Sequence, residues 1–408
     1  MSDDAFIRHK SRHAITWALL HLQRLHEAPC ATSMGTPLAG RTAFLVGAGY
    51  SLTRNGEHLR DAQAKGGVII GTNSSDPVLR ELGVVPDAVV ARESIDNSAE
   101  IAASEAPLVC LDIGVHPAMW RAAEGRLAWF IPGYPRHFHI TQRLGIRPTF
   151  GGSSAFTTAV HLARVWGAER IVLVGSGLAL TRVGDEWASY HPSAPRGDCV
   201  FDLRGDALHM RGNVANDAVT IASGQQPQPK VIGYERVPSL DWSEELPIID
   251  VLLDQRQWLE TEARRHGDRV DLVNANEGGC GIVGWRVRTL ADVVRDMPET
   301  PGAVVFRGER SITEEHVRAL VRDLLAECDL LERASALMLE RRGPPLAALP
   351  HVSGLAFGAP LIETLAAWRI LDAPTSDAGE RCRYVYQAMR EAADEARRVL
   401  RAGRREAA

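Results

Sequence analysis

The stretch Thr42–Asn55, TAFLVGAGYSLTRN, joins a short apolar run to a glycine-rich bend and a helical segment. Such a bend lets backbone N–H groups approach an anion closely, and the dipole of the following helix favours negative charge there. We therefore expect a phosphate-binding turn in which Gly47, Gly49 and Ser51 contact the ligand. A Gly49→Val substitution should then abolish nucleotide binding and leave the fold intact.

The turn differs from a dinucleotide-binding fingerprint at two points. Leu52 replaces the third glycine of the GxGxxG pattern, and the second apolar run leads into Thr72 and Asn73, with no acid for a ribose hydroxyl. The pattern therefore disfavours NAD and favours a phosphate or nucleotide ligand of another kind, with Thr72 and Asn73 among its binding residues. A tight strand–helix turn without any ligand is the alternative.

A second helix start carries Gly151, Gly152, Ser153 and Ser154. Its N–H and hydroxyl groups are donors that suit a carboxylate or a phosphate. An ordinary serine N-cap with small residues packed against a sheet is the alternative. Because this is the second anion-suited helix start in one α/β pattern, we favour a binding role.

Two further motifs follow apolar runs. Gly175 and Ser176 come directly after the run that ends at Val174, and we expect them beside the ligand. Asn274, Glu277 and Gly278 belong to the polar turn NANEGG, which suits hydrogen bonds to a sugar or a base. A turn made of residues that tolerate left-handed backbone is the alternative for NANEGG.

The segment from Gly175 to about Lys230 is long, polar and rich in Gly, Pro, Asp and Arg. We interpret it as a long loop that acts as a lid, a binding segment or a disordered insert. It contains Asp185 and His191, which are candidate general bases, although loops also carry such residues for solubility.

Acids near the expected strand ends are Asp87, Glu93 and Asp112. They are the residues that would hold a divalent cation on a phosphate chain, and Glu93 is also a candidate catalytic residue. We expect no zinc or CxxC site, because the six cysteines are spread widely along the chain.

These motifs need an α/β frame to bring them together. Short apolar runs alternate with helical segments of about ten residues, which indicates a Rossmann-like, mostly parallel sheet with helices on both faces and its ligand crevice beyond the carboxyl ends of the strands. The expected strands are Ala43–Val46, Val68–Ile70, Ala88–Ala91, Leu108–Leu111, Leu127–Ile131, Ile171–Val174 and Val270–Val273, and the expected helices include residues 4–28, Glu244–His266, a segment with a capping box at Ser311–Glu314, and Tyr384–Leu400.

The length of 408 residues predicts more than one domain. We expect an N-terminal helix and linker over residues 1–40, a Rossmann-like catalytic core over residues 41–290 and a C-terminal helical domain over residues 291–408. The C-terminal helices offer a surface for homo-oligomer formation.

The composition narrows the class of partner. A net charge of −5 implies no general affinity for nucleic acid or for an anionic membrane surface. The N-terminus lacks the apolar core of a secretory signal, and no apolar run approaches the roughly 20 residues that span a bilayer. Scattered cysteines fit a reducing compartment, so we expect a cytoplasmic location.

The ordered set of motifs resembles one family. GAGYSL, the step Pro86–Val90, GGSSAFTTAVHLARVWGAERIVLVG with GLAL after it, and NANEGG resemble the motility-accessory-factor (Maf) glycosyltransferases, which share a core with MptE-like 6-hydroxymethylpterin diphosphokinases. The resemblance covers roughly Arg41 to Trp285. It implies a Rossmann-like core and, in the Maf branch, transfer of a nonulosonic (sialic-like) acid from a CMP-sugar to Ser or Thr of flagellin, in motility.

The chain departs from the family pattern at several positions. Tyr50 and Thr53 replace a proline and an aspartate, Glu93 stands for an aspartate, and Gly177 and Leu180 replace an acid and a tyrosine. Three hypotheses follow: a glycosyltransferase that takes a CMP-sugar as donor substrate, an MptE-like pterin diphosphokinase that uses ATP and Mg²⁺, and a non-catalytic nucleotide-binding accessory protein.

Overall fold

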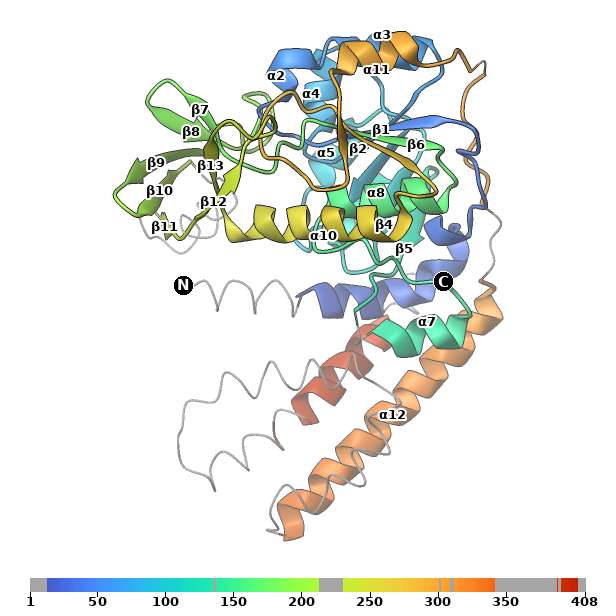
Figure 1. The fold of residues 1–408 in the computed structure, drawn as a ribbon. Helices are drawn as coiled ribbons and strands as arrows, with labels where there is room; N and C mark the ends of the chain where they lie inside the picture. The colour runs from blue at the N-terminus through green and yellow to red at the C-terminus, as the bar shows by residue number, and fades with distance from the viewer. Residues whose placement is uncertain are drawn as a thin grey trace.

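The computed structural model describes residues 13–134, 137–212, 230–300, 302–308, 312–341, 387 and 390–402. Its centre is an eight-stranded sheet with the order β15-β14-β6-β1-β2-β3-β4-β5, in which every pair of neighbours is parallel. Helices cover both faces of this sheet (Figure 1). The predicted α/β fold class is therefore confirmed.

Seven of the eight strands lie close to their predicted positions, and the short edge strand β15 was not predicted. Most of them are buried along their whole length, which explains why they appear in the sequence as short, continuous apolar runs. Their bounds are β1 (Thr42–Val46), β2 (Val68–Thr72), β3 (Ala88–Ala91), β4 (Val109–Asp112), β5 (Leu127–Phe130), β6 (Arg170–Val174), β14 (Asp271–Asn274) and β15 (Arg286–Val287).

Alternate side chains of the sheet enter two different cores. Phe44 and Val46 of β1 pack with helices α3 (His58–Ala64) and α11 (Leu290–Asp296) on one face. Ala43 and Leu45 pack with helices α8 (Ala155–Val165) and α10 (Asp250–His266) on the other. The remaining short helices of the α/β body are α2 (Leu52–Asn55), α4 (Asp76–Glu81), α5 (Ser98–Ala103) and α6 (Pro117–Ala122), whereas α7 (Phe138–Leu144) packs against α12 (Glu314–Arg341).

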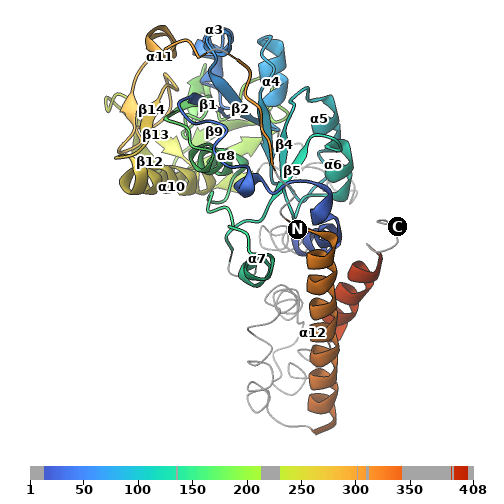
Figure 2. The same ribbon diagram turned by 90° about the vertical axis from the view of Figure 1, so that its right-hand side faces the viewer.

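Described residues from near both ends of the chain pack together beside β4 and β5. Helical residues 13–21 and the 3-10 helices η1 (Leu22–Glu27) and η2 (Ala31–Ser33) come first, and η1 contacts α12 (Glu314–Arg341). Residues of helix 390–402 join the same core. Figure 2 shows α12 projecting away from the α/β body. None of the described helices is long and apolar enough to cross a membrane.

Several predicted helix bounds need correction. The predicted helix over Glu244–His266 begins only at Asp250, because the residues before it form a strand that contains Pro247, a residue unsuited to a helix interior. Ser311 of the predicted capping box lies outside the described residues. Instead, Thr313 Oγ1 accepts a hydrogen bond from the N–H of His316 (3.2 Å) at the start of α12.

The largest correction concerns the segment after Val174, which is not a long loop. Its described part forms a five-stranded antiparallel sheet in the order β11-β10-β9-β8-β7, followed by a separate two-stranded hairpin. Most side chains of β7 to β10 are exposed or half-buried, so these strands look polar in the sequence. The strands are β7 (Thr181–Val183), β8 (Glu186–Ala188), β9 (Val200–Arg204), β10 (Ala207–Arg211), β11 (Lys230–Ile232), β12 (Glu235–Pro238) and β13 (Glu245–Ile248).

The order of the central sheet reverses at β1. The chain first adds β2, β3, β4 and β5 on one side of β1, and then returns to place β6 on the other side. Val46 at the end of β1 pairs with Val174 at the end of β6, so the loops after these two strands diverge from neighbouring points. Ligands of open α/β sheets bind at such a switch point, beyond the carboxyl ends of the strands.

Candidate functional site

A cavity of about 490 Å³ lies at this switch point. It is formed by loops that follow β1, β2, β3 and β6, together with residues of the second sheet and the starts of α8 and α10. Nine of the residues expected at the site from sequence line it: Gly47, Gly49, Ser51, Thr72, Asn73, Glu93, Ser154, Gly175 and Ser176. The lining also includes Tyr50, Asp96, Glu100, Tyr190, Arg196 and Gln255, which were not expected there.

The glycines after β1 are needed for close packing between two loops. The N–H of Gly49 donates to the carbonyl of Gly175 (2.6 Å), and a Cβ atom placed on either Gly47 or Gly49 would lie 2.6 Å from that oxygen. The N–H groups of Gly47 and Tyr50 also donate to protein carbonyls. The N–H groups of Gly47, Gly49 and Tyr50 are therefore already engaged within the protein, and a Gly49→Val variant would disturb the fold as well as the site.

Two buried serine hydroxyls are the strongest sign of a ligand. Ser51 is 2% exposed and Ser176 is 7% exposed, and the Oγ atom of each has no hydrogen-bond partner among the described residues. Leaving a buried hydroxyl unsatisfied costs about 1–3 kcal/mol. Both side chains line the cavity, so a bound ligand with polar oxygens would supply the missing partners.

The NANEGG turn supports one of these serines from outside the cavity. The N–H of Ser176 donates to Asn276 Oδ1 (2.7 Å), and Asn276 Nδ2 donates to Asn274 Oδ1 (2.7 Å). Asn274 and Asn276 are fully buried. The structure thus gives Asn274 the task of holding the Ser176 loop, and does not bring it to the cavity wall.

The sequence has no acid directly after β2, but Glu100 of α5 lies beside Asn73 at the end of that strand. Asn73, directly after β2, donates from Nδ2 to Glu100 Oε2 (2.7 Å), and Glu100 lies in the first turn of α5. Burial raises the pKa of Glu100, although the hydrogen bond from Asn73 and the charge of Arg196 oppose this shift. Local sequence around Thr72 holds no signal of this pairing, because the acid comes from the next βα unit.

A cation, Arg196, lines the same cavity, near enough to Glu100 for its charge to oppose the rise in the pKa of that carboxyl. Burial alone would lower the pKa of Arg196, but the neighbouring Tyr190 and Glu93 hold it above its ordinary value, so the guanidinium is charged. The segment that carries Tyr190 runs beside the glycine turn, where the N–H of Tyr50 donates to the carbonyl of Ser189 (3.2 Å). This antiparallel contact brings residues of the second sheet to the switch point.

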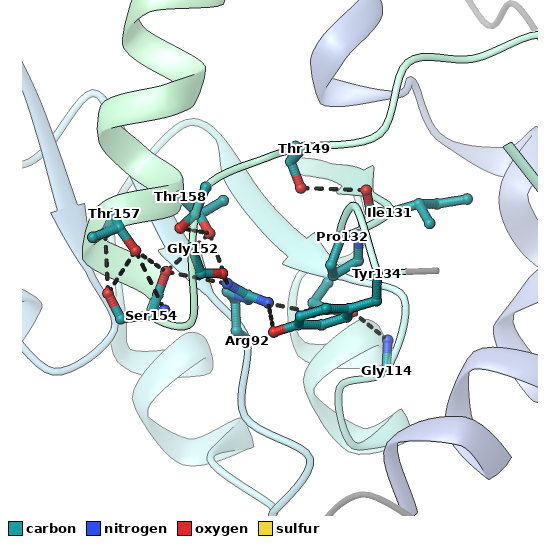
Figure 3. Close-up of polar contacts among 12 residues, drawn as sticks. Arg92, Gly114, Ile131, Pro132, Tyr134, Thr149, Gly152, Ser154, Thr157 and Thr158 are labelled. Atoms are coloured by element: carbon teal, nitrogen blue, oxygen red, sulfur yellow. Dashed lines mark hydrogen bonds and ion pairs between the residues drawn. The ribbon is translucent and has the colours of Figure 1, made fainter. Parts of the chain in front are cut away.

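Arg92 organises the loop that carries the Gly151–Ser154 motif (Figure 3). Its Nη1 donates to the carbonyl of Gly152 (2.6 Å) and to Thr158 Oγ1 (3.1 Å), and its Nη2 donates to the Tyr134 hydroxyl (2.9 Å). Its Nε lies 3.4 Å from Asp112 Oδ2, and both side chains are less than one-tenth exposed. Arg92 therefore ties the ends of β3 and β4 to the start of α8.

Within that motif the four residues have different tasks. Ser154 is the N-cap of α8, where its Oγ accepts from the N–H of Thr157 (3.1 Å) in a capping box. A Cβ atom on Gly151 would lie 2.4 Å from the Cα of Thr158, so that glycine allows close packing. Gly152 has a positive φ of 63°, and Ser153 is exposed; neither of them lines the cavity.

Both candidate general bases lie outside the cavity lining. Asp185 is exposed at the turn between β7 and β8. His191 adjoins the glycine turn, but its Nδ1 accepts a hydrogen bond from the N–H of Ser193 (3.1 Å) and burial lowers its pKa. This geometry leaves the proton on Nε2, so His191 is better suited to donate a hydrogen bond than to accept a proton.

Glu277 and Gly278 belong to a second cavity, of about 430 Å³. Glu277 has a positive φ of 53°, and its Oε1 accepts from Asn55 Nδ2 (3.0 Å) and from the N–H of Leu290 (2.8 Å). Arg54 Nη1 donates to its carbonyl (2.6 Å). These contacts give Glu277 a structural task, and the structure does not bring it to the switch-point cavity.

Two of the three proposed cation ligands are engaged elsewhere. Asp87 precedes β3, at the end of the sheet opposite the cavity, and accepts from the N–H of Ile69 (2.8 Å). Asp112 pairs with Arg92 and accepts from the N–H of Gly114 (2.8 Å). Throughout the described part of the chain, no three His, Cys, Asp or Glu side chains gather so that they could hold a metal ion.

Comparison with known proteins finds a family match that includes most of the residues lining the switch-point cavity. Residues 21–183 match the family model of MptE-like 6-hydroxymethylpterin diphosphokinases. A solved structure of a Maf glycosyltransferase from Magnetospirillum magneticum AMB-1 is similar with a TM-score of 0.46 and 14% identity, over 94% of this chain and 59% of that one. The search of curated proteins found no match. The family match, which includes β1 to β6 and the loops that form most of the cavity, confirms the resemblance to the MptE-like family over residues 21–183.

Proposed function

We propose that the chain is a glycosyltransferase that moves a nonulosonic acid from a CMP-sugar to a Ser or Thr hydroxyl of a protein, with flagellin as the expected acceptor. The observation that carries the proposal is the pair of unpartnered hydroxyls of Ser51 and Ser176 in the switch-point cavity. Hydroxyl donors at this place suit the oxygens of a nucleotide phosphate. The donor sugar and the acceptor come from the family resemblance.

The cavity residues suggest how the transfer would proceed. The bond between the anomeric carbon and the CMP phosphate breaks, and CMP leaves with the electron pair. The hydroxyls of Ser51 and Ser176 and the charge of Arg196 would stabilise the negative charge that develops on the phosphate. The acceptor oxygen bonds to the anomeric carbon as Glu93, the acid predicted as catalytic that does line the cavity, takes its proton.

A pterin diphosphokinase is the second candidate, because the family model that matches residues 21–183 carries that description. Transfer of a diphosphate from ATP requires Mg²⁺ held by carboxylates. The described acids do not gather into a group suited to a cation, so the residues do not fit this requirement. This function therefore ranks second.

A thermal-shift screen with CMP, CDP, ATP and GTP, with and without Mg²⁺, separates the candidates. A ligand at a hundred times its dissociation constant should stabilise the native state by about 2.7 kcal/mol. We expect CMP to stabilise the protein without Mg²⁺, and a Ser51→Ala, Ser176→Ala double variant to lose the effect. Ser153→Ala is the matched control, because Ser153 is exposed and outside the cavity lining.

Three results would contradict the proposal. Stabilisation by ATP only with Mg²⁺, followed by AMP release with hydroxymethylpterin, would favour the diphosphokinase. No stabilisation by any nucleotide would favour a non-catalytic accessory role. CMP binding without any change in the mass of flagellin incubated with a CMP-nonulosonate would remove the proposed acceptor.

A further inference from the structure

We infer that the Asn73–Glu100 pair recognises a ribose hydroxyl, so that the switch-point cavity selects ribonucleotides over deoxyribonucleotides. This inference deepens the proposed function and rests on it. It assigns a specificity role to Glu100, a residue for which the sequence motifs gave no signal.

The strand order places three polar positions in a row. The cavity spans the ends of β6, β1 and β2, which are neighbours in the sheet. Ser176 follows β6, Ser51 follows β1, and Asn73 follows β2. If the serines bind the phosphate at the switch point, the sugar attached to that phosphate can extend over the end of β2. In α/β nucleotide sites, an acid at the end of this strand binds the ribose hydroxyls.

The atoms of the pair suit that task. Asn73 is 4% exposed and its Nδ2 donates to Glu100 Oε2 (2.7 Å), which fixes the direction of the carboxylate. Within the described residues, Glu100 Oε1 has no recorded hydrogen bond, and Glu100 lines the cavity. A ribose hydroxyl is a donor that this oxygen can accept, and the hydrogen bond would be charge-assisted.

The acid at the end of β2 therefore comes from a different part of the chain than in the usual nucleotide site. The usual acid follows the second strand directly, and here that place is taken by Thr72 and Asn73. α5 lies after β3, and its first turn brings Glu100 back to Asn73. The absence of an acid next to β2 in the sequence thus does not mean that the site lacks one.

The test compares binding of CMP, 2′-deoxy-CMP and 3′-deoxy-CMP to the full chain by calorimetry. A hydrogen bond between a ribose hydroxyl and a carboxylate should favour CMP over at least one deoxy analogue by about tenfold or more. In Glu100→Gln this preference should shrink to about threefold or less. The amide has the same shape as the acid, and its oxygen can still accept the hydrogen bond from Asn73 Nδ2, so the variant should fold.

Asp206→Asn is the matched control, since it makes the same chemical change at an exposed turn outside the cavity and should keep the full preference. ATP, 2′-deoxy-ATP and 3′-deoxy-ATP form a second arm. If only ATP binds and its deoxy analogues bind more weakly in a Glu100-dependent way, the ribose assignment stands and the CMP donor is wrong. Equal binding of CMP and both deoxy analogues, or an unchanged preference in Glu100→Gln, overturns the ribose assignment alone. Binding of no nucleotide overturns both.

Discussion

Replacing Arg92 should destabilise the protein and weaken nucleotide binding together. The guanidinium is buried between the ends of β3 and β4 and the start of α8, and its side chain is 8% exposed. It holds the Gly152 carbonyl and Thr158, and so sets the position of the α8 N-terminus, where Ser154, Ala155 and Phe156 line the cavity. Figure 3 shows these contacts converging on the one side chain.

The magnitude follows from what a substitution leaves behind. Arg92→Met would remove the positive charge beside Asp112, whose side chain is 9% exposed, and the donor to the Gly152 carbonyl. Removing one partner of a buried ion pair typically costs about 3–5 kcal/mol. Arg92→Lys keeps the charge but cannot reproduce the planar fork that reaches three loops at once, so we expect a loss of about 1–3 kcal/mol.

Chemical denaturation measures the free energy of unfolding of each variant, and calorimetry with CMP measures its affinity. Arg204→Met is the control, because the Arg204–Asp202 pair is at the surface, with Arg204 68% exposed, and should contribute less than about 1 kcal/mol. An Arg92→Met variant that loses less than about 1 kcal/mol, or that loses stability but binds CMP like the wild type, would refute the reasoning.

Three further predictions concern other parts of the chain. Burial lowers the pKa of His21 to about 4, so its stabilising contribution is present above pH 6.5 and is lost as the pH falls. Chemical denaturation should show that His21→Gln reduces the loss of unfolding free energy between pH 7 and pH 5 by about 2 kcal/mol. An unchanged pH profile would show that His21 does not cause this loss of stability. Gly49→Ala should lower the unfolding free energy by about 1–3 kcal/mol, because the added Cβ would clash with the Gly175 carbonyl. Gly233→Ala should have little effect, because no atom lies within 4 Å of the added Cβ. Equal melting temperatures for the two variants would contradict this prediction. Glu277→Ala should cost about 1–3 kcal/mol, because it removes the acceptor for two donors, and should leave CMP affinity unchanged; a selective loss of CMP affinity in calorimetry would return Glu277 to the nucleotide site.

Local patterns in the sequence were sufficient for seven of the eight strands of the central sheet; β15 was not predicted, because it is two residues long and both are exposed. Strands buried on both faces must be apolar along their whole length, and the runs that became β1 and β6 show this directly. The same rule placed Ser51 and Ser176 at strand ends, where both now line the cavity. The strands after Val174 were missed because most of their side chains are exposed or half-buried and form no continuous apolar run, although Gly205 and Asp206 between β9 and β10 are a hairpin signal.

Only the tertiary structure shows which groups the individual polar residues contact. Periodicity and spacing report which residues share a strand or a helix face, but contacts between distant segments depend on strand order and on how the loops pack. The glycines after β1 resemble a phosphate loop in sequence, yet their neighbour is the Gly175 carbonyl. NANEGG resembles a ligand-binding turn, yet the Glu277 carboxylate binds Asn55 of α2 and the start of α11, and the residue lines a second cavity. Glu100 and Arg196 carry no motif, and they reach the switch point because α5 and the second sheet fold back over the ends of β2 and β1.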